Sequence, residues 1–522
     1  MKVTKTETKE STKHSCGYGY HQKDSAEYEG EGGAHIGGRT TENNLTNTVT
    51  EEKKLLEEIV TPENLNLAYQ RVRRKKGAGG VDGMSVEELR KYLKENGEEI
   101  RQSILAGKYK PSPVKRVEIP KEAGKTRKLG IPTAVDRVIQ QAIAQVISPI
   151  YEEKFMETSY GFRPGKSAHD ALKMCQMLMD VGYVWAVDMD LEKFFDTVNQ
   201  SKLVELLSRE IKDGRVISLI HKYLRAGAIY CGRFEETRKG VPQGGPLSPL
   251  LANILLNELD HELARRKHWF IRYADDLLIL CKSKASAEQA LKHIKPYIEK
   301  KLFLKVNMEK TEVAYVGNIK FLGYGFYKDE NGYQMRVHKK TVKKLQEKVR
   351  QLTDRSKSYA ERKEQLRKFI IGWVNYYRLA KMEKLLKRTD EWMRRRIRMN
   401  IWKMWKKTRT RYTNLEKLGV SHENAGILAN SRKGCWRLSS SPILHVALSN
   451  KRLEKAGYLF FSLLDQLMSF RLPHQKSVRH GEILAVCYFD RSGEICPIRH
   501  FEHSREIFYL LLCHLWHDYF QT

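Results

Sequence analysis

Apolar residues recur at helical spacing through much of the chain, and shorter apolar runs typical of strands lie between these stretches. The helical pattern predicts helices at about 55–67, 85–96, 134–151, 248–265 and 287–302, and from the residues after 190 to about 226. The strand pattern predicts strands within 110–131, at 183–190, 269–273 and 277–281, and near Lys305, Val313 and Phe321. Beyond about residue 339 the pattern is helical. We therefore expect an α+β core followed by an all-α region.

Turn and cap residues set several of the expected element ends. Pro62 suits the first turn of a second helix within 55–67, and Ser85 with Glu88 three residues later is a capping-box pattern for the next helix. The strands of 110–131 are expected to join at a turn over 122–124. A Gly/Pro turn at 240–246 leads into a helix for which Ser248 is the expected cap.

The charge balance indicates that the protein binds a polyanion. Lys and Arg number 94 against 63 Asp and Glu, which gives a formal net charge of +31. Because neutralising phosphates releases counterions, nucleic acid is the expected partner. The alternative is a generally basic protein without a specific ligand.

Other whole-chain features bear on location. No apolar run reaches the roughly 18 residues that a membrane helix needs, so no membrane partner is expected. Residues 1–50 are expected to be a flexible tail and not a signal peptide. The eight cysteines form no Cys-x-x-Cys pair, which predicts reduced thiols in a cytosol-like compartment and no zinc ribbon.

Aspartates on apolar strands are the candidate chemistry. Asp188 and Asp190 alternate with apolar residues, so they share one strand face. Asp275 and Asp276 lie between two apolar strands, where adjacent carboxylates are unfavourable unless a cation compensates them. Converging carboxylates would hold two hard divalent cations, which an in-line phosphoryl displacement uses. The alternative is that Asp-Asp is only a polar hairpin turn.

Several motifs resemble those of reverse transcriptases. Tyr273-Ala274-Asp275-Asp276 matches their Tyr-x-Asp-Asp signature, and the run from Asp190 to Asp196 resembles their first catalytic motif. In that motif the metal-binding aspartate precedes an aromatic residue by five positions, which selects Asp190 and leaves Asp188 and Asp196 as structural. The resemblance implies that Phe195 excludes a nucleotide 2′-hydroxyl; the alternative is that Phe194 or Phe195 is only core.

The resemblance also implies a set of metal ligands and nucleotide contacts. Two Mg²⁺ ions, with Mn²⁺ as the alternative metal, would be held by Asp190, the backbone carbonyl of Leu191, Asp275 and Asp276. The run from Lys239 to Pro249 resembles the Pro-Gln-Gly motif, in which Gln243 contacts the incoming nucleotide and Pro242 and Gly244 lie along the template. Its glycines would let the backbone approach a flat base.

From about Leu55 to Leu453 the chain resembles the proteins encoded by bacterial group II introns. The resemblance implies that Lys121 and Arg127 hold the nucleotide triphosphate, with generic contact to the phosphate backbone as the alternative. Arg163, in a Ser-Tyr-Gly-Phe-Arg-Pro-Gly segment, would lie along the template. Lys310, in Asn-Met-Glu-Lys-Thr, would protonate the leaving pyrophosphate as a general acid; the alternative is a surface lysine that contacts phosphate.

The basic helical region resembles the thumb, or maturase domain, of that family. Basic and aromatic residues interleave there, which suits an RNA groove, although Trp373 and Tyr377 are expected in the helix core. The expected RNA-binding residues are Arg394, Arg395, Arg396, Lys406 and Lys407.

The resemblance divides the chain into five parts. They are a flexible tail (1–50), right-hand polymerase fingers and palm with an N-terminal extension (51–333), an all-α basic thumb (334–412), a small helical DNA-binding region (413–474) and an unassigned tail (475–522). Many members of the family end in a zinc-binding endonuclease domain with paired cysteines, and no such pairs occur here. The cysteines and histidines between Cys487 and His514 lack metal-ligand spacing, so no zinc site is expected.

The resemblance implies an RNA-directed DNA polymerase that also acts as a maturase in the bacterial cytoplasm. It would bind intron RNA to promote splicing and support intron mobility by target-primed reverse transcription. The implied partners are intron RNA, an RNA template with a DNA primer, target DNA and dNTPs, and no oligomer is required. The alternatives are a splicing maturase without polymerase activity, or a retron, diversity-generating or defence-associated reverse transcriptase.

Overall fold

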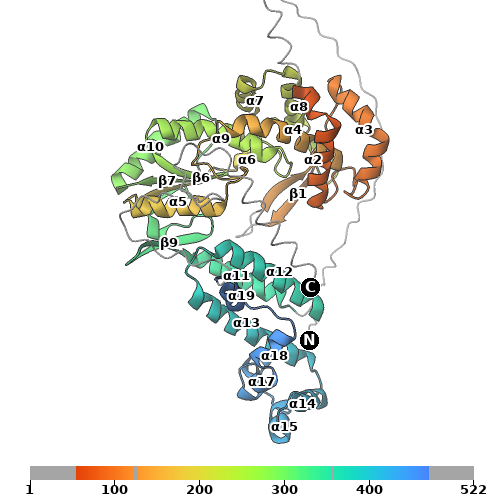
Figure 1. Cartoon of the computed structure of the whole chain (residues 1–522), viewed down its shortest axis with the longest axis vertical. Coiled ribbons are helices and arrows are strands. Elements are labelled where there is room, and N and C mark those ends of the chain that lie inside the picture. The colour runs from red at the N-terminus through yellow and green to blue at the C-terminus, as the bar shows by residue number, and fades with distance from the viewer. Residues whose placement is uncertain (1–54, 121–125, 355–357, 470–522) are drawn as a thin grey trace, which may run out of the picture.

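The structure is a computed structural model that describes residues 55–120, 126–354 and 358–469 (Figure 1). The predicted tails at 1–50 and 475–522 lie outside these residues, as do the turn at 122–124 and Lys121. The described part combines helices and strands up to residue 337 and is helical beyond it, as the sequence pattern predicts.

The N-terminal part packs helices around a small sheet. Its helices are α1 (Leu55–Ile59), α2 (Pro62–Arg74), α3 (Leu89–Leu105) and α4 (Ala134–Glu152). Its sheet has the order β2-β1-β4-β5, with β1 (Val114–Pro120), β2 (Thr126–Ile131), β4 (Ala228–Tyr230) and β5 (Arg233–Glu235). Pro62 occupies the first turn of α2, as predicted.

Two of the predicted helix caps differ from the structure. Ser85 and Glu88 exchange the expected hydrogen bonds, but they do so one turn before α3, which begins at Leu89 and continues through Gly97 to Leu105. The predicted end near residue 96 is therefore wrong, because one glycine is tolerated inside a helix at a modest cost. Ser248 is the first helical residue of α9 and not its cap; its hydroxyl donates to the carbonyl of Pro242 at 2.5 Å.

A second sheet, the central sheet, has the order β6-β7-β3-β8, and every neighbouring pair is antiparallel. Its strands are β3 (Trp185–Met189), β6 (Trp269–Tyr273), β7 (Asp276–Cys281) and β8 (Glu312–Tyr315). Helices α5 (Ala168–Asp180) and α9 (Ser248–Arg265) pack against β6, and α10 (Lys284–Lys301) packs against β3, β7 and β8 (Figure 1). Helices α6 (Phe194–Thr197), α7 (Gln200–Glu210) and α8 (Gly214–Arg225) follow β3 in the chain, and α7 packs against α8 and α9.

Successive side chains of the central strands point to opposite faces of the sheet and belong to two separate hydrophobic cores. Val187 and Met189 of β3 join a core that includes α10, whereas Ala186 joins a core that includes α5 and the C-terminal helices. On β7, Leu278 and Leu280 share the second core. Side chains at even-numbered positions of β3 and β7 therefore face the helical C-terminal part.

The strand predicted near Lys305 is wrong, and the strand predicted near Phe321 begins later than expected. The first is only a bridge between Leu191 and Val306, and Phe321 itself forms a bridge with Tyr324. The strand begins three residues after Phe321 because Leu322 and Gly323 have positive φ angles of 49° and 86°. A hairpin that the sequence pattern did not predict follows, formed by β9 (Tyr324–Asp329) and β10 (Gly332–Val337).

The C-terminal part is helical. Its helices are α11 (Lys339–Leu352), α12 (Tyr359–Tyr377), α13 (Glu383–Met404), α14 (Thr408–Lys417), α15 (His422–Ala429), α16 (Cys435–Leu438), α17 (Pro442–Ala447), α18 (Asn450–Lys455) and α19 (Phe461–Ser469). Trp373 is buried as predicted, whereas Tyr377 is only half-buried. A third core around Trp402 joins the end of α13 to α14, α15 and α17. None of the helices within the described residues is long and apolar enough to cross a membrane.

Candidate active site

Strand register brings the predicted aspartates together. Met189 of β3 pairs with Leu277 of β7, so continuing the register by one residue sets Asp190 opposite Asp276. Asp188, Asp190 and Asp276 all occupy even-numbered positions and therefore share the face toward the C-terminal helices. All three line one cleft of about 980 Å³. Asp275 is exposed at the β6–β7 turn beside them.

Asp190 is held by the segment that precedes β8. One of its carboxylate oxygens accepts hydrogen bonds from the Asn307 side-chain amide and the Lys310 ammonium, each at 3.0 Å. Its backbone is fixed as well, because its N–H donates to the Thr311 hydroxyl and its carbonyl accepts from the N–H of Asn307. The sequence prediction singled out Lys310 from this segment but missed Asn307, although both belong to the same motif.

The carboxylates disfavour one another's ionisation. Partial removal from water, together with the charges of Asp275 and Asp190, raises the pKa of Asp276 to about 6. Burial, followed by the charges of Asp276, Glu312 and Asp190, raises the pKa of Asp188 to about 7. Asp188 faces the same cleft as these two aspartates, and its expected structural role stays a prediction. Asp196 is exposed on α6.

The donor set fits a hard divalent cation in its chemistry. Carboxylate oxygens are the ligands such ions prefer, and a cation would relieve the repulsion that raises the pKa of Asp276. Across the described residues, no three His, Cys, Asp or Glu side chains already form a metal-binding group. Lys310 instead pairs with Asp190 at 3.0 Å, so a metal bound here would compete with that ion pair.

The loop from Pro242 to Gly245 packs directly on β2. Arg127 donates to the Gln243 side chain at 2.7 Å, and the N–H of Gly130 donates to the Gln243 carbonyl at 2.8 Å. Gly244 has φ +133°, and a Cβ there would lie 2.4 Å from the Gly130 carbonyl oxygen. Only glycine fits at this contact. The hydrogen bond between Arg127 and Gln243 brings these two predicted nucleotide contacts together.

The two phenylalanines of α6 differ in burial. Phe194 is 3% exposed, whereas Phe195 is half-buried and meets it edge-on. The carbonyl of Phe195 accepts from the N–H of Val241, which ties α6 to the loop beside Pro242. The core role that the sequence left open therefore falls to Phe194.

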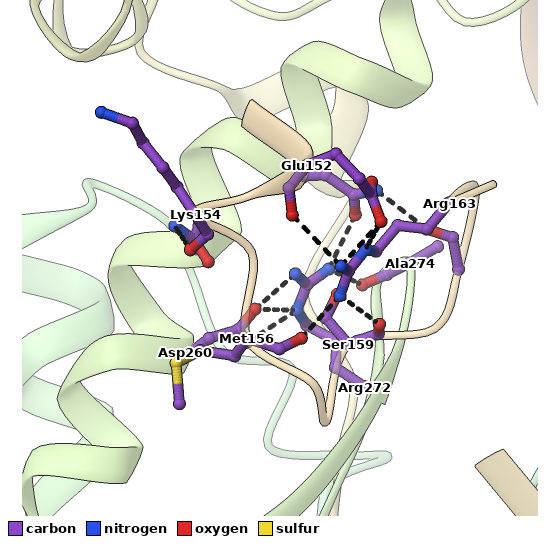
Figure 2. Close-up of polar contacts among 11 residues, drawn as sticks. Glu152, Lys154, Met156, Ser159, Arg163, Asp260, Arg272 and Ala274 are labelled. Carbon is purple, nitrogen blue, oxygen red and sulfur yellow. Dashed lines mark hydrogen bonds and ion pairs between the residues drawn. The ribbon is translucent and has the colours of Figure 1, made fainter. Parts of the chain in front are cut away.

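Arg163 is buried against its own loop. It is 7% exposed and donates to Glu152 and to the carbonyls of Met156 and Ser159 (Figure 2). Its guanidinium donors thus face internal acceptors. This arginine therefore holds its own loop, and its contact with the template stays a prediction.

The predicted RNA-binding residues differ in exposure. Arg394 lies over the ring of Phe460, Arg395 over the ring of Trp436, and Arg396 donates to Thr353. These three arginines are half-buried in contacts within the C-terminal helices. Lys406 and Lys407, by contrast, are exposed.

The cleft has an acidic side and a basic side. The aspartates face lysines of α11 that are spaced four residues apart, at positions 340, 344 and 348, and therefore follow one helix face. Aromatic residues of α12 complete the lining, among them Trp373 and Tyr377. A polyanion beside the aspartates would meet this basic helix face.

Comparison with known proteins identifies the family. Residues 119–326 match the model described as "Reverse transcriptase (RNA-dependent DNA polymerase)", and residues 342–419 match "Group II intron, maturase-specific domain". Protein YkfC of Escherichia coli (strain K12) is 36% identical over 55% of this chain and 86% of its own length. The chain belongs to the group II intron reverse transcriptases and maturases.

One more relative and one solved structure are similar to this reverse transcriptase. Group II intron-encoded protein LtrA of Lactococcus lactis subsp. cremoris is 29% identical over 66% of this chain and 73% of its own length. A chain titled "Partial Cas6-RT-Cas1--Cas2 complex" superposes on 47% of this chain and 43% of that chain, at 26% identity and TM-score 0.31. The protein is thus an RNA-directed DNA polymerase with a maturase-specific domain, of a class that uses divalent metal ions and binds RNA and DNA.

Proposed function

We propose that this reverse transcriptase serves a group II intron in two ways. It binds the intron RNA as a maturase to promote splicing, and it extends a DNA 3′ end on that RNA so that the intron inserts by target-primed reverse transcription. Its partners would be the intron RNA, the RNA template with its primer, target DNA and dNTPs. The proposal rests on one observation: the same chain contains both the aspartate site and a maturase-specific domain.

In this proposal residues 51–333 form the fingers and palm, 334–412 the thumb and 413–474 the DNA-binding region. The template–primer duplex would run along the cleft, with its phosphates on the lysine face of α11 and its 3′ end beside Asp190. Arg127 and Gln243, already bonded to each other, would meet the incoming nucleotide, with Pro242 and Gly244 beside the template and Phe195 beneath the sugar. Lys121 would complete the triphosphate contact.

We propose Asp190, Asp275, Asp276 and the Leu191 carbonyl as ligands of two Mg²⁺ ions. Such ions supply activation of the 3′-hydroxyl and stabilisation of the leaving pyrophosphate. Asn307 would keep the Asp190 carboxylate oriented when a metal displaces Lys310 from it. The Lys310 ammonium, once released from its ion pair with Asp190, would be available to donate a proton to the pyrophosphate oxygen.

Primer extension by the full chain tests the polymerase. A DNA primer annealed to an RNA template is incubated with dNTPs and Mg²⁺, and extension to the template end is expected. Splicing of a precursor RNA that contains the intron, at a low Mg²⁺ concentration, tests the maturase. Splicing assistance without any extension would identify a maturase that lacks polymerase activity.

Metal affinity should depend on pH through Asp276. Because the pKa of Asp276 is raised to about 6, its carboxyl is protonated at lower pH and a cation must displace that proton. Mn²⁺ affinity is therefore expected to rise by up to about tenfold per pH unit below pH 6 and to level off above about pH 7. Electron paramagnetic resonance of free Mn²⁺ measures this directly. In Asp276→Asn the step near pH 6 should vanish; affinity that does not change with pH in the parent protein would contradict the assignment.

Exposed lysines should carry part of the RNA affinity. Replacing Lys406 and Lys407 together by Gln removes two exposed charges. The slope of log affinity for intron RNA against log salt is expected to fall in magnitude by about 1.5 to 2, one phosphate contact for each lysine. Filter binding at several KCl concentrations measures the slope. The matched control is Lys300→Gln with Lys301→Gln, an exposed pair at the end of α10; an equal loss there would mean that only net charge matters.

A further inference from the structure

The turn that carries the catalytic aspartates has an unusual backbone. Tyr273 pairs with Asp276, so Ala274 and Asp275 alone connect β6 to β7. Ala274 has φ +57°, a left-handed conformation that a residue with a side chain rarely adopts. Such a conformation persists where the surroundings over-determine it. The contacts beneath the turn are therefore informative.

Arg272 supplies one of these contacts from inside the protein. Its side chain is 1% exposed and forms an ion pair with Asp260 of α9, where Nε donates to Oδ1 at 2.7 Å and Nη2 to Oδ2 at 2.5 Å. The remaining nitrogen, Nη1, donates to the carbonyl of Ala274 at 3.1 Å and to Asn253 at 2.9 Å. Figure 2 shows the guanidinium of Arg272 bonded to Asp260 and Ala274.

A loop packed against the turn supplies a second set of contacts. Arg272 donates its backbone N–H to Thr158 and accepts at its carbonyl from Tyr160, so the loop runs along β6. Gly161 lies so close that a Cβ there would be 2.2 Å from the Ala274 nitrogen. The Asn253 side chain donates to the Gly161 carbonyl at 2.8 Å and accepts from Arg272, which links loop and turn.

Arg163 in turn fixes that loop. Its Nη1 donates to the carbonyls of Met156 and Ser159 at 2.6 and 2.9 Å, while Nη2 donates to Glu152 at 2.7 Å (Figure 2). Two buried arginines thus act on the same structure, one under the loop and one under the turn. An ion pair buried this deeply is often replaceable by apolar side chains without loss of stability, so stability alone gives a weak reason for it.

We propose that Arg272 is a positioning residue for DNA synthesis. By bonding the Ala274 carbonyl and Asp260 at once, it fixes the left-handed turn and so sets the direction of the Asp275 and Asp276 carboxylates toward Asp190. Asn253 and the loop held by Arg163 support the same turn. The inference rests on the proposed role of Asp275 and Asp276 as metal ligands.

The test uses Arg272→Lys in the full chain. Lysine keeps the positive charge beside Asp260 but has one nitrogen in place of a planar fork, so it cannot bond the carboxylate and the turn together. We expect kcat for primer extension to fall by about 10- to 100-fold with little change in KM for dNTP, and the Kd for Mn²⁺ to rise by about tenfold, as for other residues that orient metal ligands. Free Mn²⁺ is measured by electron paramagnetic resonance on a complex stalled with a dideoxy-terminated primer and the next dNTP.

Two further variants separate positioning from folding. Asn253→Ala leaves the Arg272–Asp260 ion pair in place and should raise the Mn²⁺ Kd in the same direction by a smaller factor. Arg398→Lys is the matched control, a buried arginine that holds the Leu448 carbonyl and Asn450 within the C-terminal helices. It should lower the unfolding temperature and leave the Mn²⁺ Kd unchanged.

The outcomes are distinct. The inference is overturned if Arg272→Lys keeps the parent's Mn²⁺ Kd and loses activity only in proportion to its folded fraction. If Arg272→Lys does not fold, the same outcome for Asn253→Ala overturns it. An equal change of Mn²⁺ Kd in Arg398→Lys would overturn it too. If the parent protein extends primers but Asp275→Asn binds Mn²⁺ as the parent does, the proposed metal ligands fail and the positioning role fails with them.

Discussion

Asp275→Asn is expected to reduce DNA synthesis by at least about 10³-fold, which corresponds to about 4 kcal/mol of lost transition-state stabilisation. Asparagine retains the size of the side chain and removes the charge that a divalent cation requires. Asp275 is exposed at its turn, so folding should be unaffected. Single-turnover primer extension gives the rate, and RNA binding in the same preparation should match that of the parent protein.

The matched control for this prediction is Asp196→Asn. Asp196 is an exposed aspartate on α6, a few residues beyond Asp190, and no metal role is assigned to it. It should extend primers at the parent rate. Loss of RNA binding together with DNA synthesis in Asp275→Asn would mean that Asp275 serves both activities, contrary to the proposal.

Trp402→Ala is expected to have the largest effect on stability. The side chain is completely buried at the centre of the third core and lies under the guanidinium of Arg411. Truncation of such a residue typically costs about 3–5 kcal/mol. Because this core joins α14, α15 and α17 to the end of α13, these helices should loosen while the central sheet, which belongs to other cores, stays folded.

The functional effect of Trp402→Ala should be the opposite of that of Asp275→Asn: RNA binding should be lost and DNA synthesis kept. Hydrogen exchange is expected to rise over residues 408–448, and affinity for intron RNA to fall, while extension of a short primer–template remains. Trp405→Ala is the control, since that ring is only half-buried against the same core and should have a smaller effect. Equal loss of primer extension in Trp402→Ala would show that the C-terminal helices and the polymerase site are one cooperative unit.

Sequence reasoning succeeded where alternation and local turn chemistry decide the structure. The period-two pattern of residues 183–190 and the tight turn at Ala274 were enough to predict β3, β6 and β7 and to bring Asp190 near Asp276. The Gly/Pro turn likewise predicted where α9 begins.

Sequence reasoning failed where a side chain's direction depends on distant contacts. Arg163 was expected along the template because its segment resembles a block of the family that lies there, whereas in the structure Glu152 and two backbone carbonyls hold its side chain inside the loop. Arg272 passed unnoticed, although an arginine inside an apolar strand was a usable signal of a buried partner. That partner, Asp260, comes from another helix, and no local pattern in the sequence links the two.

The pairing of β3 with β7 has a consequence for how this protein can evolve. Asp190 and Asp276 face each other only because Met189 pairs with Leu277. Deleting one residue from β7 would exchange the two faces of the strand on one side of the deletion, and so would move either Leu278 and Leu280 out of their core or Asp276 out of register with Asp190. Length changes should therefore accumulate in loops such as the β9–β10 turn and be rare in β3, β6 and β7.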